Sequence, residues 1–306
     1  MLSESLQVEA EHGLHDAYRV QVFADLDEAL ASRPGAVFVC NPSSLHLPIA
    51  LEAARAGGNL FIEKPLSHTY EGVDALLAAV EERDLVGLVG YQWRFHPCLV
   101  QARELLGENA IGRVLAVRAE VGEYLPHWHT YEDYRQTYGA RRELGGGVLL
   151  SQIHEMDYLY WFFGLPKRVY CVGGHLSRLE IDVEDVASTL MEFATDGHIF
   201  PVHLHQDYLQ RPPSRRCHII GEEGRIEMDL MARTVRVFDG HSALARLYDF
   251  SGVERNQMFL DELKHFLACL RRQQTPVVSV RDGAASLRMA LAAKQSLETR
   301  QVVELD

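Results

Sequence analysis

The sequence lacks any apolar run close to the ~20 residues that a membrane-spanning helix needs. Its first residues, Met1 to Gln7, have neither the basic nor the apolar segment of a signal peptide. The five cysteines are widely spread and form no CxxC pair, so neither a disulfide framework nor a zinc ribbon is indicated. We therefore expect a protein of the reducing cytoplasm that has no membrane contact.

Basic residues are also scarce, because 30 Lys and Arg stand against 43 Asp and Glu, for a formal net charge of −13. Nucleic-acid binding depends on clustered Lys and Arg, so a nucleic-acid partner is not expected. Hydrophobic residues make up 47% of the 306 residues, which is ordinary for a globular protein. The length suits one large domain or two domains of ~100–200 residues each.

The first third of the chain alternates short apolar runs with helical segments, after a polar stretch, Met1 to Tyr18, that forms at most a short helix. We expect strands at residues 20–23, 36–40, 60–62 and 86–89, and helices at residues 25–31, 46–56, 70–83 and 97–106. This alternation is typical of a parallel sheet with crossover helices. Asn41, Lys64 and Arg94 follow three successive strands, so all three would meet at one edge of the sheet, where ligands bind in open α/β folds.

Lys64 stands directly before Pro65, and a proline disfavours the helical conformation of the residue before it. The lysine is therefore expected to be extended, at or near the end of a strand. From these residues alone it is either a general acid or base or an ordinary surface lysine at a turn.

A dinucleotide-binding sheet normally opens with a strand, a G-x-G-x-x-G turn and a helix that together hold the pyrophosphate. That spacing does not occur in this chain, and Gly145-Gly-Gly147 comes far too late to supply it. Three explanations stand: the chain lacks its first βαβ piece, a cofactor is held in another way, or no dinucleotide binds.

After Gly112 the pattern changes to that of a mostly antiparallel sheet. We expect strands at residues 114–124, 169–172, 187–193, 199–207, 218–220, 225–229 and 234–238, and helices at residues 148–163, 256–271 and 281–298. The predicted fold is α/β, with an incomplete Rossmann-type parallel sheet domain over residues 1–110. An α+β domain with a large, mostly antiparallel open sheet follows over residues 111–306, and its last helix and strand pack back on the first domain.

Two further groups of side chains have more than one interpretation. The loop from Pro126 to Tyr138 is rich in Trp, Tyr and His, which suits either a packed surface loop or a site for a sugar or polyol. His203 and His205 share one strand face and could bind a metal. Because no third ligand stands at a diagnostic spacing, we interpret them as an exposed sheet face or subunit interface and predict no metal site.

Four segments come in a suggestive order: Asn41-Pro-Ser-Ser-Leu-His46, Glu63-Lys-Pro65, Gly90-Tyr-Gln-Trp-Arg-Phe-His-Pro97 and Gly145-Gly-Gly-Val, followed by His154-Glu-Met-Asp157. Together they resemble the glucose–fructose oxidoreductase/inositol dehydrogenase (Gfo/Idh/MocA) family, over nearly the whole chain from about Val20. The resemblance implies an oxidoreductase that uses NAD or NADP, with a sugar, polyol or nucleotide-linked sugar as substrate. It also implies a homodimer or homotetramer formed through the C-terminal sheet.

The resemblance assigns roles to particular residues. It implies that Lys64 and His154 exchange the proton of the reacting hydroxyl or carbonyl, since alcohol oxidation removes a proton as well as a hydride. The implied cofactor-binding residues are Asn41, Pro42, His46, Glu63, Lys64 and Arg94. The implied substrate-binding residues are Trp93, Arg94, His127, Trp128, Tyr138 and Asp157.

The chain departs from the family at two places. Where the family often has an aspartate about one helical turn before the histidine, this chain has Leu150 and Ser151. The glycine-rich turn is absent as well, and our preferred interpretation is a chain that begins late. Two alternatives from other classes are a catalytically inactive, oligomer-forming or ligand-binding relative, and a metal-dependent hydrolase built on His154, His203 and His205.

Overall fold

The computed structural model describes residues 20–305 apart from 196 and 242. The short helix considered for Met1 to Tyr18 lies outside the described residues. The strand predicted at residues 20–23 is wrong, because that segment pairs with no other strand of the described chain. The first described element is a helix, α2, at Leu26–Ala31, and the side chain of Asp25 accepts a hydrogen bond from the Glu28 N–H at its start.

The predicted parallel sheet is confirmed. Three strands lie in the order β1-β2-β3, and both pairings are parallel, with Phe38 beside Phe61 and Phe61 beside Leu88. The strands and their crossover helices are β1 at Ala36–Val39, α3 at Ser43–Arg55, β2 at Asn59–Glu63, α4 at Val73–Glu82 and β3 at Gly87–Gly90. The apolar runs that form β2 and β3 are buried, as in other parallel sheets, whereas β1 is only partly covered and its Phe38 is 48% exposed.

Helix α4 begins three residues later than predicted. Gly72, directly before it, has a φ of +85°, a left-handed conformation that glycine adopts without the steric cost of a side chain. The segment between Lys64 and Gly72 therefore runs as a loop across the carboxyl end of the sheet instead of starting a helix at Tyr70.

The predicted antiparallel sheet is also confirmed, and it is larger than expected. Nine strands lie in the order β11-β10-β9-β8-β4-β7-β6-β5-β12, and β4–β7 is the single parallel pair among the described strands of this sheet. They are β4 at Val114–Gly122, β5 at Arg168–Gly174, β6 at Val186–Thr195, β7 at His198–Asp207, β8 at Ser214–Gly221, β9 at Gly224–Asp229, β10 at Thr234–Asp239, β11 at Leu244–Asp249 and β12 at Val303–Glu304. The last two had not been predicted, because β11 is almost wholly exposed and β12 has only two residues.

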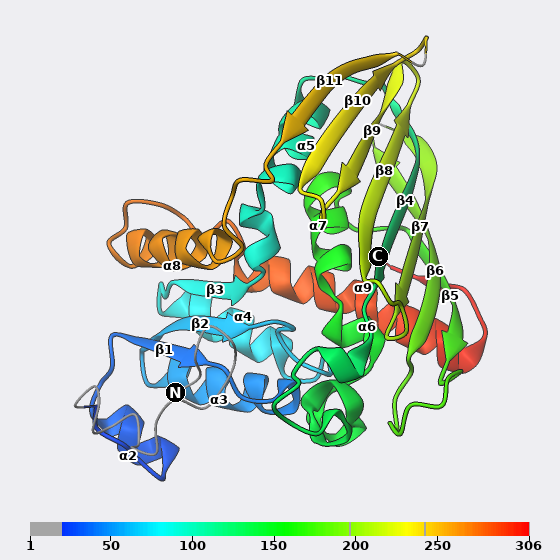
Figure 1. Ribbon diagram of the computed structural model, residues 1–306. Coiled ribbons are helices and arrows are strands. Elements are labelled where there is room, and N and C mark those ends of the chain that lie inside the picture. The colour runs from blue at the N-terminus through cyan, green and yellow to red at the C-terminus, as the bar shows by residue number, and fades with distance from the viewer. Residues whose placement is uncertain (1–19, 196, 242, 306) are drawn as a thin grey trace.

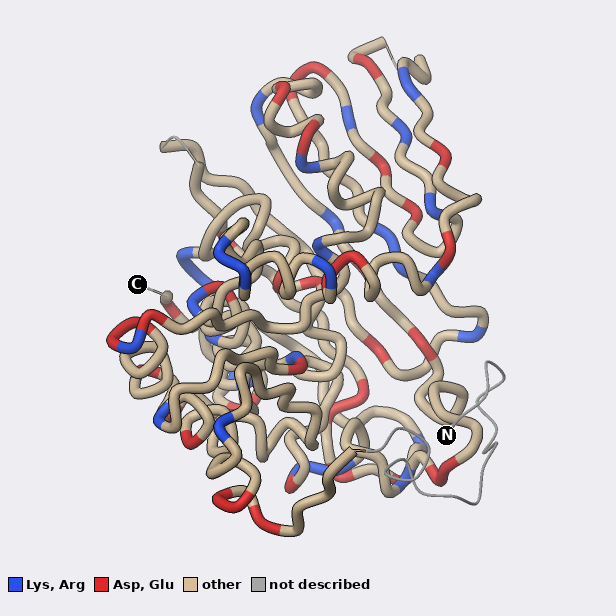
Figure 2. Tube along the Cα trace, turned by 90° about the vertical axis from the view of Figure 1, so that its left-hand side faces the viewer, with Lys and Arg blue, Asp and Glu red and all other residues tan. Residues whose placement is uncertain are grey.

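Helices cover one face of the nine-stranded sheet, and no described element covers the other (Figure 1). The bare face exposes apolar side chains, among them Val172, Leu190 and Ile199, each about half exposed. Basic and acidic positions follow one another along the strands at the β11 end of the sheet (Figure 2), and Arg216 on β8 pairs with Asp229 on β9 at 3.2 Å.

The helix predicted over residues 148–163 is two helices. Helix α6 at Val148–Ser151 and helix α7 at His154–Phe163 are separated by a turn at Gln152 and Ile153. A further helix, α5, spans Pro97–Gly107, and short 3₁₀ helices lie at Gln92–Phe95 (η1), Leu125–His127 (η2), Tyr134–Gln136 (η3), Tyr138–Ala140 (η4) and Arg142–Leu144 (η5). The break places His154 at the first residue of a helix, not in the middle of one.

The two final helices contact the parallel sheet, whereas the last strand, which was also predicted to pack on the first domain, pairs with β5 of the large sheet. Helix α8 at Gln257–Leu270 packs on the parallel sheet, where Phe266 lies edge-on to Phe38 and Phe61, with ring centroids 5.4 and 5.5 Å apart. Helix α9 at Val280–Thr299 starts with a capping box between Ser279 and Asp282 and runs across both sheets. Within the described residues no helix is long and apolar enough to cross a membrane.

The contact between α9 and β3 depends on glycine. A Cβ on Gly283 would lie 2.6 Å from Cγ2 of Val89, and a Cβ on Gly87 would lie 2.5 Å from Cγ2 of Val280. Both distances are far shorter than ordinary contacts between carbon atoms, so backbone and side chain meet here without room for a methyl group.

We predict that Gly283→Ala lowers the free energy of unfolding by about 1 kcal/mol, because overpacking costs ~1–3 kcal/mol and helix propensity returns ~1 kcal/mol. Urea unfolding followed by circular dichroism measures the change. Gly107→Ala is the matched control, since nothing lies within 4 Å of the added methyl group. Equal stability of Gly283→Ala and the natural chain would contradict this packing.

Candidate active site

The ends of β1 and β2 are tied together by one buried imidazole. Nδ1 of His46 lies 2.7 Å from the carbonyl oxygen of Pro65, and Nε2 lies 2.7 Å from the carbonyl oxygen of Asn41. His46 is 1% exposed. The structure therefore brings Asn41 and Lys64 to one edge of the sheet, with His46 between them, whereas Arg94, which the strand order also predicted there, binds Asp157.

The ammonium group of Lys64 reaches across to the broken helix. Its Nζ donates a hydrogen bond to the backbone carbonyl oxygen of Ser151 at 2.8 Å. That oxygen is free because the helix stops at Ser151, so the usual donor four residues later does not bind it. The Glu63 carboxylate accepts a hydrogen bond from the backbone N–H of Lys64 at 3.2 Å, so it orients the lysine through the main chain.

His154 faces the same space as Lys64. It is 5% exposed, its ring meets that of Tyr91 edge-on at 5.7 Å, and its Nδ1 has no hydrogen-bond partner among the described residues. Burial, followed by the charges of Lys64 and Arg215, holds the pKa of His154 well below its usual value of 6.5. At neutral pH the imidazole is therefore uncharged and able to accept a proton.

Lys64 and His154 line one cavity of about 760 Å³, together with Trp93, Trp128, Tyr138 and Gln152 among others. Three lining side chains besides His154 hold a buried polar atom without a partner within the described residues, namely Nε1 of Trp128, Oγ of Ser151 and Oε1 of Gln152. The amide nitrogen of Gln152 donates to the Asp207 carbonyl oxygen at 2.9 Å, which leaves its oxygen as an acceptor. The wall thus offers an N–H donor and an acceptor, which a hydroxyl-rich ligand can satisfy together.

One wall of the cavity is a stack of three side chains. The indole of Trp93 lies between the imidazole of His96, at 4.9 Å, and the guanidinium of Arg215, at 4.0 Å. The carboxylate of Glu155, which directly follows His154, accepts two hydrogen bonds from Arg215 at 2.7 and 3.0 Å. None of Arg215, Gln152 and His96 was a predicted site residue. Arg215 and Gln152 stand in no motif of the sequence, and the segment that contains His96 predicts no contact for it.

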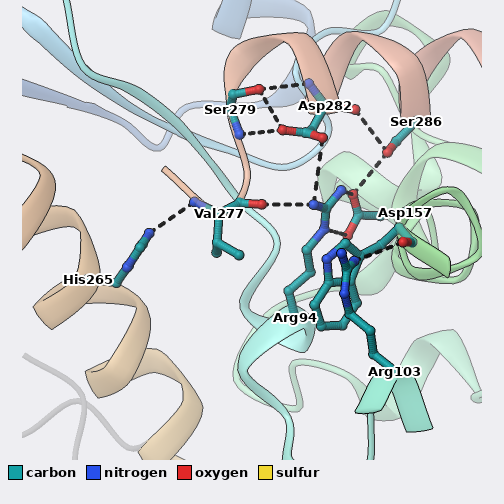
Figure 3. A network of polar contacts seen from close by, with 9 residues as sticks. Arg94, Arg103, Asp157, His265, Val277, Ser279, Asp282 and Ser286 are labelled. Atoms are coloured by element: carbon teal, nitrogen blue, oxygen red, sulfur yellow. Dashed lines mark hydrogen bonds and ion pairs between the residues drawn. The ribbon is translucent and has the colours of Figure 1, made fainter. Parts of the chain in front are cut away.

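Arg94 and Asp157, predicted to contact cofactor and substrate, bind each other instead. Nε and one terminal nitrogen of Arg94 donate to the Asp157 carboxylate at 2.8 and 2.7 Å, and another donates to the Val277 carbonyl oxygen at 2.9 Å (Figure 3). Ser286 adds a hydrogen bond to Asp157 at 3.0 Å. Both charged groups are almost wholly buried and neither lines the cavity, so neither Arg94 nor Asp157 is part of the candidate site.

The aromatic loop is divided between the cavity and its surroundings. Trp128 and Tyr138 line the cavity, as does His129, which had not been singled out. His127 does not line it; its ring packs edge-on against Tyr124 at 4.8 Å.

The histidines of the alternative metal site make other contacts on the bare face of the sheet. Nε2 of His203 lies 2.9 Å from Oγ of Ser188, and Nε2 of His205 lies 3.1 Å from the Asp207 carboxylate. Among residues 20–305, as far as they are described, no three His, Cys, Asp or Glu side chains are placed to hold a metal ion.

His96 links the site to the stability of the fold. Burial, with the charges of Arg215 and Arg233, lowers its pKa to about 4, and its Nδ1 accepts a hydrogen bond from the Cys98 N–H at the start of α5. The unfolded chain binds a proton at this residue below about pH 6.5, whereas the folded chain does so only near pH 4. The contribution of His96 to the free energy of unfolding is therefore lost as the pH falls from about 6.5 to about 4.

We predict that His96→Asn, which keeps a capping acceptor, reduces the loss of unfolding free energy between pH 7 and pH 5 by about 2 kcal/mol. Urea unfolding at the two pH values measures the loss for each variant. Replacing the exposed His241 by Asn is the control and leaves the loss unchanged. An equal loss in His96→Asn and the natural chain would contradict the buried, uncharged state of His96.

Comparison with known protein families gives two matches on this chain. Residues 3–91 match the profile described as "Oxidoreductase family, NAD-binding Rossmann fold", and residues 99–227 match the GFO/IDH/MocA C-terminal domain. The first match covers β1, β2 and β3, and the second covers most of the large sheet.

Curated relatives support the match at low identity. The myo-inositol 2-dehydrogenase of Thermotoga maritima is 26% identical over 277 residues, which are 89% of this chain and 80% of that protein. The levoglucosan dehydrogenase of Pseudarthrobacter phenanthrenivorans is 28% identical over 214 residues, which are 62% of this chain and 54% of that protein.

Solved structures share the fold. A putative oxidoreductase from Thermotoga maritima superposes with a TM-score of 0.80 at 22% identity, over 95% of this chain and 87% of the other. The WlbA dehydrogenase of Bordetella pertussis, in complex with NADH and UDP-GlcNAcA, superposes with a TM-score of 0.78 at 24% identity, over 95% and 86%. On these matches, the chain belongs to the Gfo/Idh/MocA family of NAD-binding oxidoreductases.

Proposed function

We propose that this protein transfers hydride between a nicotinamide and a secondary alcohol or carbonyl of a sugar, polyol or nucleotide-linked sugar. The observation that carries the proposal is the meeting of Lys64 and uncharged His154 in one cavity whose wall has unpaired polar atoms. The inositol and levoglucosan dehydrogenases among the relatives support the same class of substrate.

The residues at the strand ends fit a nicotinamide cofactor. Asn41 and Pro42 follow β1 and Lys64 follows β2, at the carboxyl ends of parallel strands where such ligands bind. Asn41 is exposed and its side chain has no hydrogen bond within the described residues, so its amide is free for a ligand. When bound, NAD or NADP would supply the hydride acceptor or donor. His46 then acts as a positioning residue, because it holds Asn41 and Pro65 in place.

Lys64 and His154 have different roles in the proposed reaction, because one side chain is charged and the other is not. His154 is the acceptor of the hydroxyl proton in alcohol oxidation, since its pKa is held low and its ring is uncharged. Lys64 lies at the same cavity, where its positive charge stabilises the negative charge that develops on the substrate oxygen. In the reverse direction, the proton returns from His154 to the same oxygen.

We predict that Lys64→Met lowers kcat/KM by at least about 10²-fold, because it removes both the charge and the hydrogen-bond donor from the reacting oxygen. Steady-state assays with a panel of sugars and polyols measure the loss, and circular dichroism checks the fold. Lys167→Met, at an exposed lysine before β5, is the control and keeps full activity. Undiminished turnover in Lys64→Met would rule out this assignment.

We also predict that the purified 306-residue chain binds NADH or NADPH. Titration with each cofactor, followed by nicotinamide fluorescence and by the shift in Tm, measures the binding, and ADP-ribose serves as the control without a nicotinamide. No response at millimolar cofactor would favour instead a catalytically inactive, ligand-binding relative.

For the assembly, we propose a homodimer or homotetramer formed through the bare face of the large sheet. The half-exposed Val172, Leu190 and Ile199 on that face support it, because exposed apolar patches mark contact surfaces. For the location, we propose the reducing cytoplasm, which the five unpaired cysteines support.

A further inference from the structure

The cavity extends well beyond the catalytic pair. A hexose has twelve non-hydrogen atoms, which fill at most about 360 Å³ at the ~30 Å³ that one molecule of liquid water occupies. The cavity measures about 760 Å³, so a single sugar ring beside Lys64 and His154 leaves about half of it empty. Of the residues predicted to hold the cofactor, Lys64 alone lines the cavity, so the part of the cavity away from Lys64 is available to the substrate.

The outer end of the cavity is formed by segments remote from the catalytic pair. They are the turn between β9 and β10, the segment that joins β11 to α8, and the first turn of α8, which approach one another on the side of the molecule where α8 lies (Figure 1). The apolar side chains of Phe95, Leu230 and Met258 line this end, and Met231 is 48% exposed there. We call these segments, with the side chains they place in the cavity, the outer chamber.

Two arginines give the outer chamber its charge. Arg233 donates a hydrogen bond to the Val253 carbonyl oxygen, which fixes its guanidinium at the chamber wall. Its charge contributes to the low pKa of His96, which lines the same cavity. Arg255 is exposed, and its guanidinium has no hydrogen bond or ion pair within the described residues.

The other charges that line the cavity near the outer chamber are largely engaged elsewhere. Asp261 accepts a hydrogen bond from Gln257 at 2.7 Å and lies 3.5 Å from the ammonium of Lys264. Arg215 is neutralised by the buried Glu155, and Glu123 lies 3.8 Å from it. Glu254, which is exposed, is the remaining acid of the chamber. Arg233 also acts on Asp249, which lies outside the cavity lining and whose pKa its charge helps to lower. Arg233 and Arg255 both line the cavity and can bind an anion there, because guanidinium groups match phosphate and carboxylate geometry well.

We propose that the outer chamber binds a negatively charged group, phosphate or carboxylate, that is covalently attached to the sugar whose hydroxyl reacts at Lys64 and His154. The inference rests on the proposed function and narrows its substrate class to anionic sugar derivatives. Arg233 and Arg255 bind the anion, and the apolar side chains contact whatever the anion carries beyond it.

Binding can be measured without turnover, by isothermal titration calorimetry of the full chain with matched ligands. The neutral ligands are glucose and methyl glucoside, and the anionic ones are glucose 1-phosphate, glucuronate and uridine diphosphate glucose. We expect at least one anionic ligand to bind roughly tenfold more tightly than its neutral counterpart, with an affinity that falls as salt rises. The phosphate and carboxylate arms show which anion is preferred.

The variants Arg233→Gln and Arg255→Gln test the two arginines. Each is expected to weaken the anionic ligand roughly tenfold and to leave the neutral ligand unchanged. Arg233→Gln keeps an amide donor for the Val253 carbonyl oxygen. Arg236→Gln, at an exposed position on β10 that does not line the cavity, is the matched control and changes neither ligand.

Three results would overturn the inference: equal affinity for neutral and anionic ligands, an equal loss in Arg236→Gln, or no binding of any ligand in the set. A different result would contradict the proposed function without affecting this inference. Tight binding of an anionic sugar with full activity in Lys64→Met would contradict the catalytic assignment and leave the outer chamber as inferred.

Discussion

The buried ion pair between Arg94 and Asp157 holds the site together. Arg94 follows β3, Asp157 lies one turn after His154 on α7, and the Val277 carbonyl oxygen that Arg94 also binds lies three residues before the start of α9. Removing one partner of such a pair costs about 3–5 kcal/mol, because the other charge is left buried and unpaired. Through this contact the parallel sheet that carries Lys64 and the helix that carries His154 have a defined relative position.

A second constraint is the break between α6 and α7. A continuous helix would bind the Ser151 carbonyl oxygen internally, and Lys64 would then need another partner. The break instead offers this oxygen to Lys64, about one helical turn before His154, where the resemblance leads one to expect an aspartate and this chain has Leu150 and Ser151. The lysine keeps a hydrogen-bond acceptor without gaining a carboxylate, so its positive charge acts in full on the buried His154, whose pKa it helps to lower.

Much of the fold followed from local patterns, because apolar runs of β-forming residues between helical segments have few structural alternatives. The errors have physical causes. Residues 20–23 have strand-forming side chains but find no partner strand, and β11 is almost wholly exposed, so it lacks the alternation that marks a half-buried strand. The break at Gln152 and Ile153 carries no proline and no glycine, so periodicity alone predicted a continuous helix.

For the site, the sequence alone predicted that Asn41 and Lys64 lie at one edge of the parallel sheet, because parallel strands end at the same edge. It also placed His154 on a helix after a glycine-rich turn. Three contacts are seen only in the folded structure. Arg94 and Asp157 bind each other, and Arg215 stacks on Trp93. Arg233 and Arg255 line the cavity. These contacts join residues far apart in the chain, and no local spacing encodes them, because long-range packing alone sets which charged side chain meets which partner.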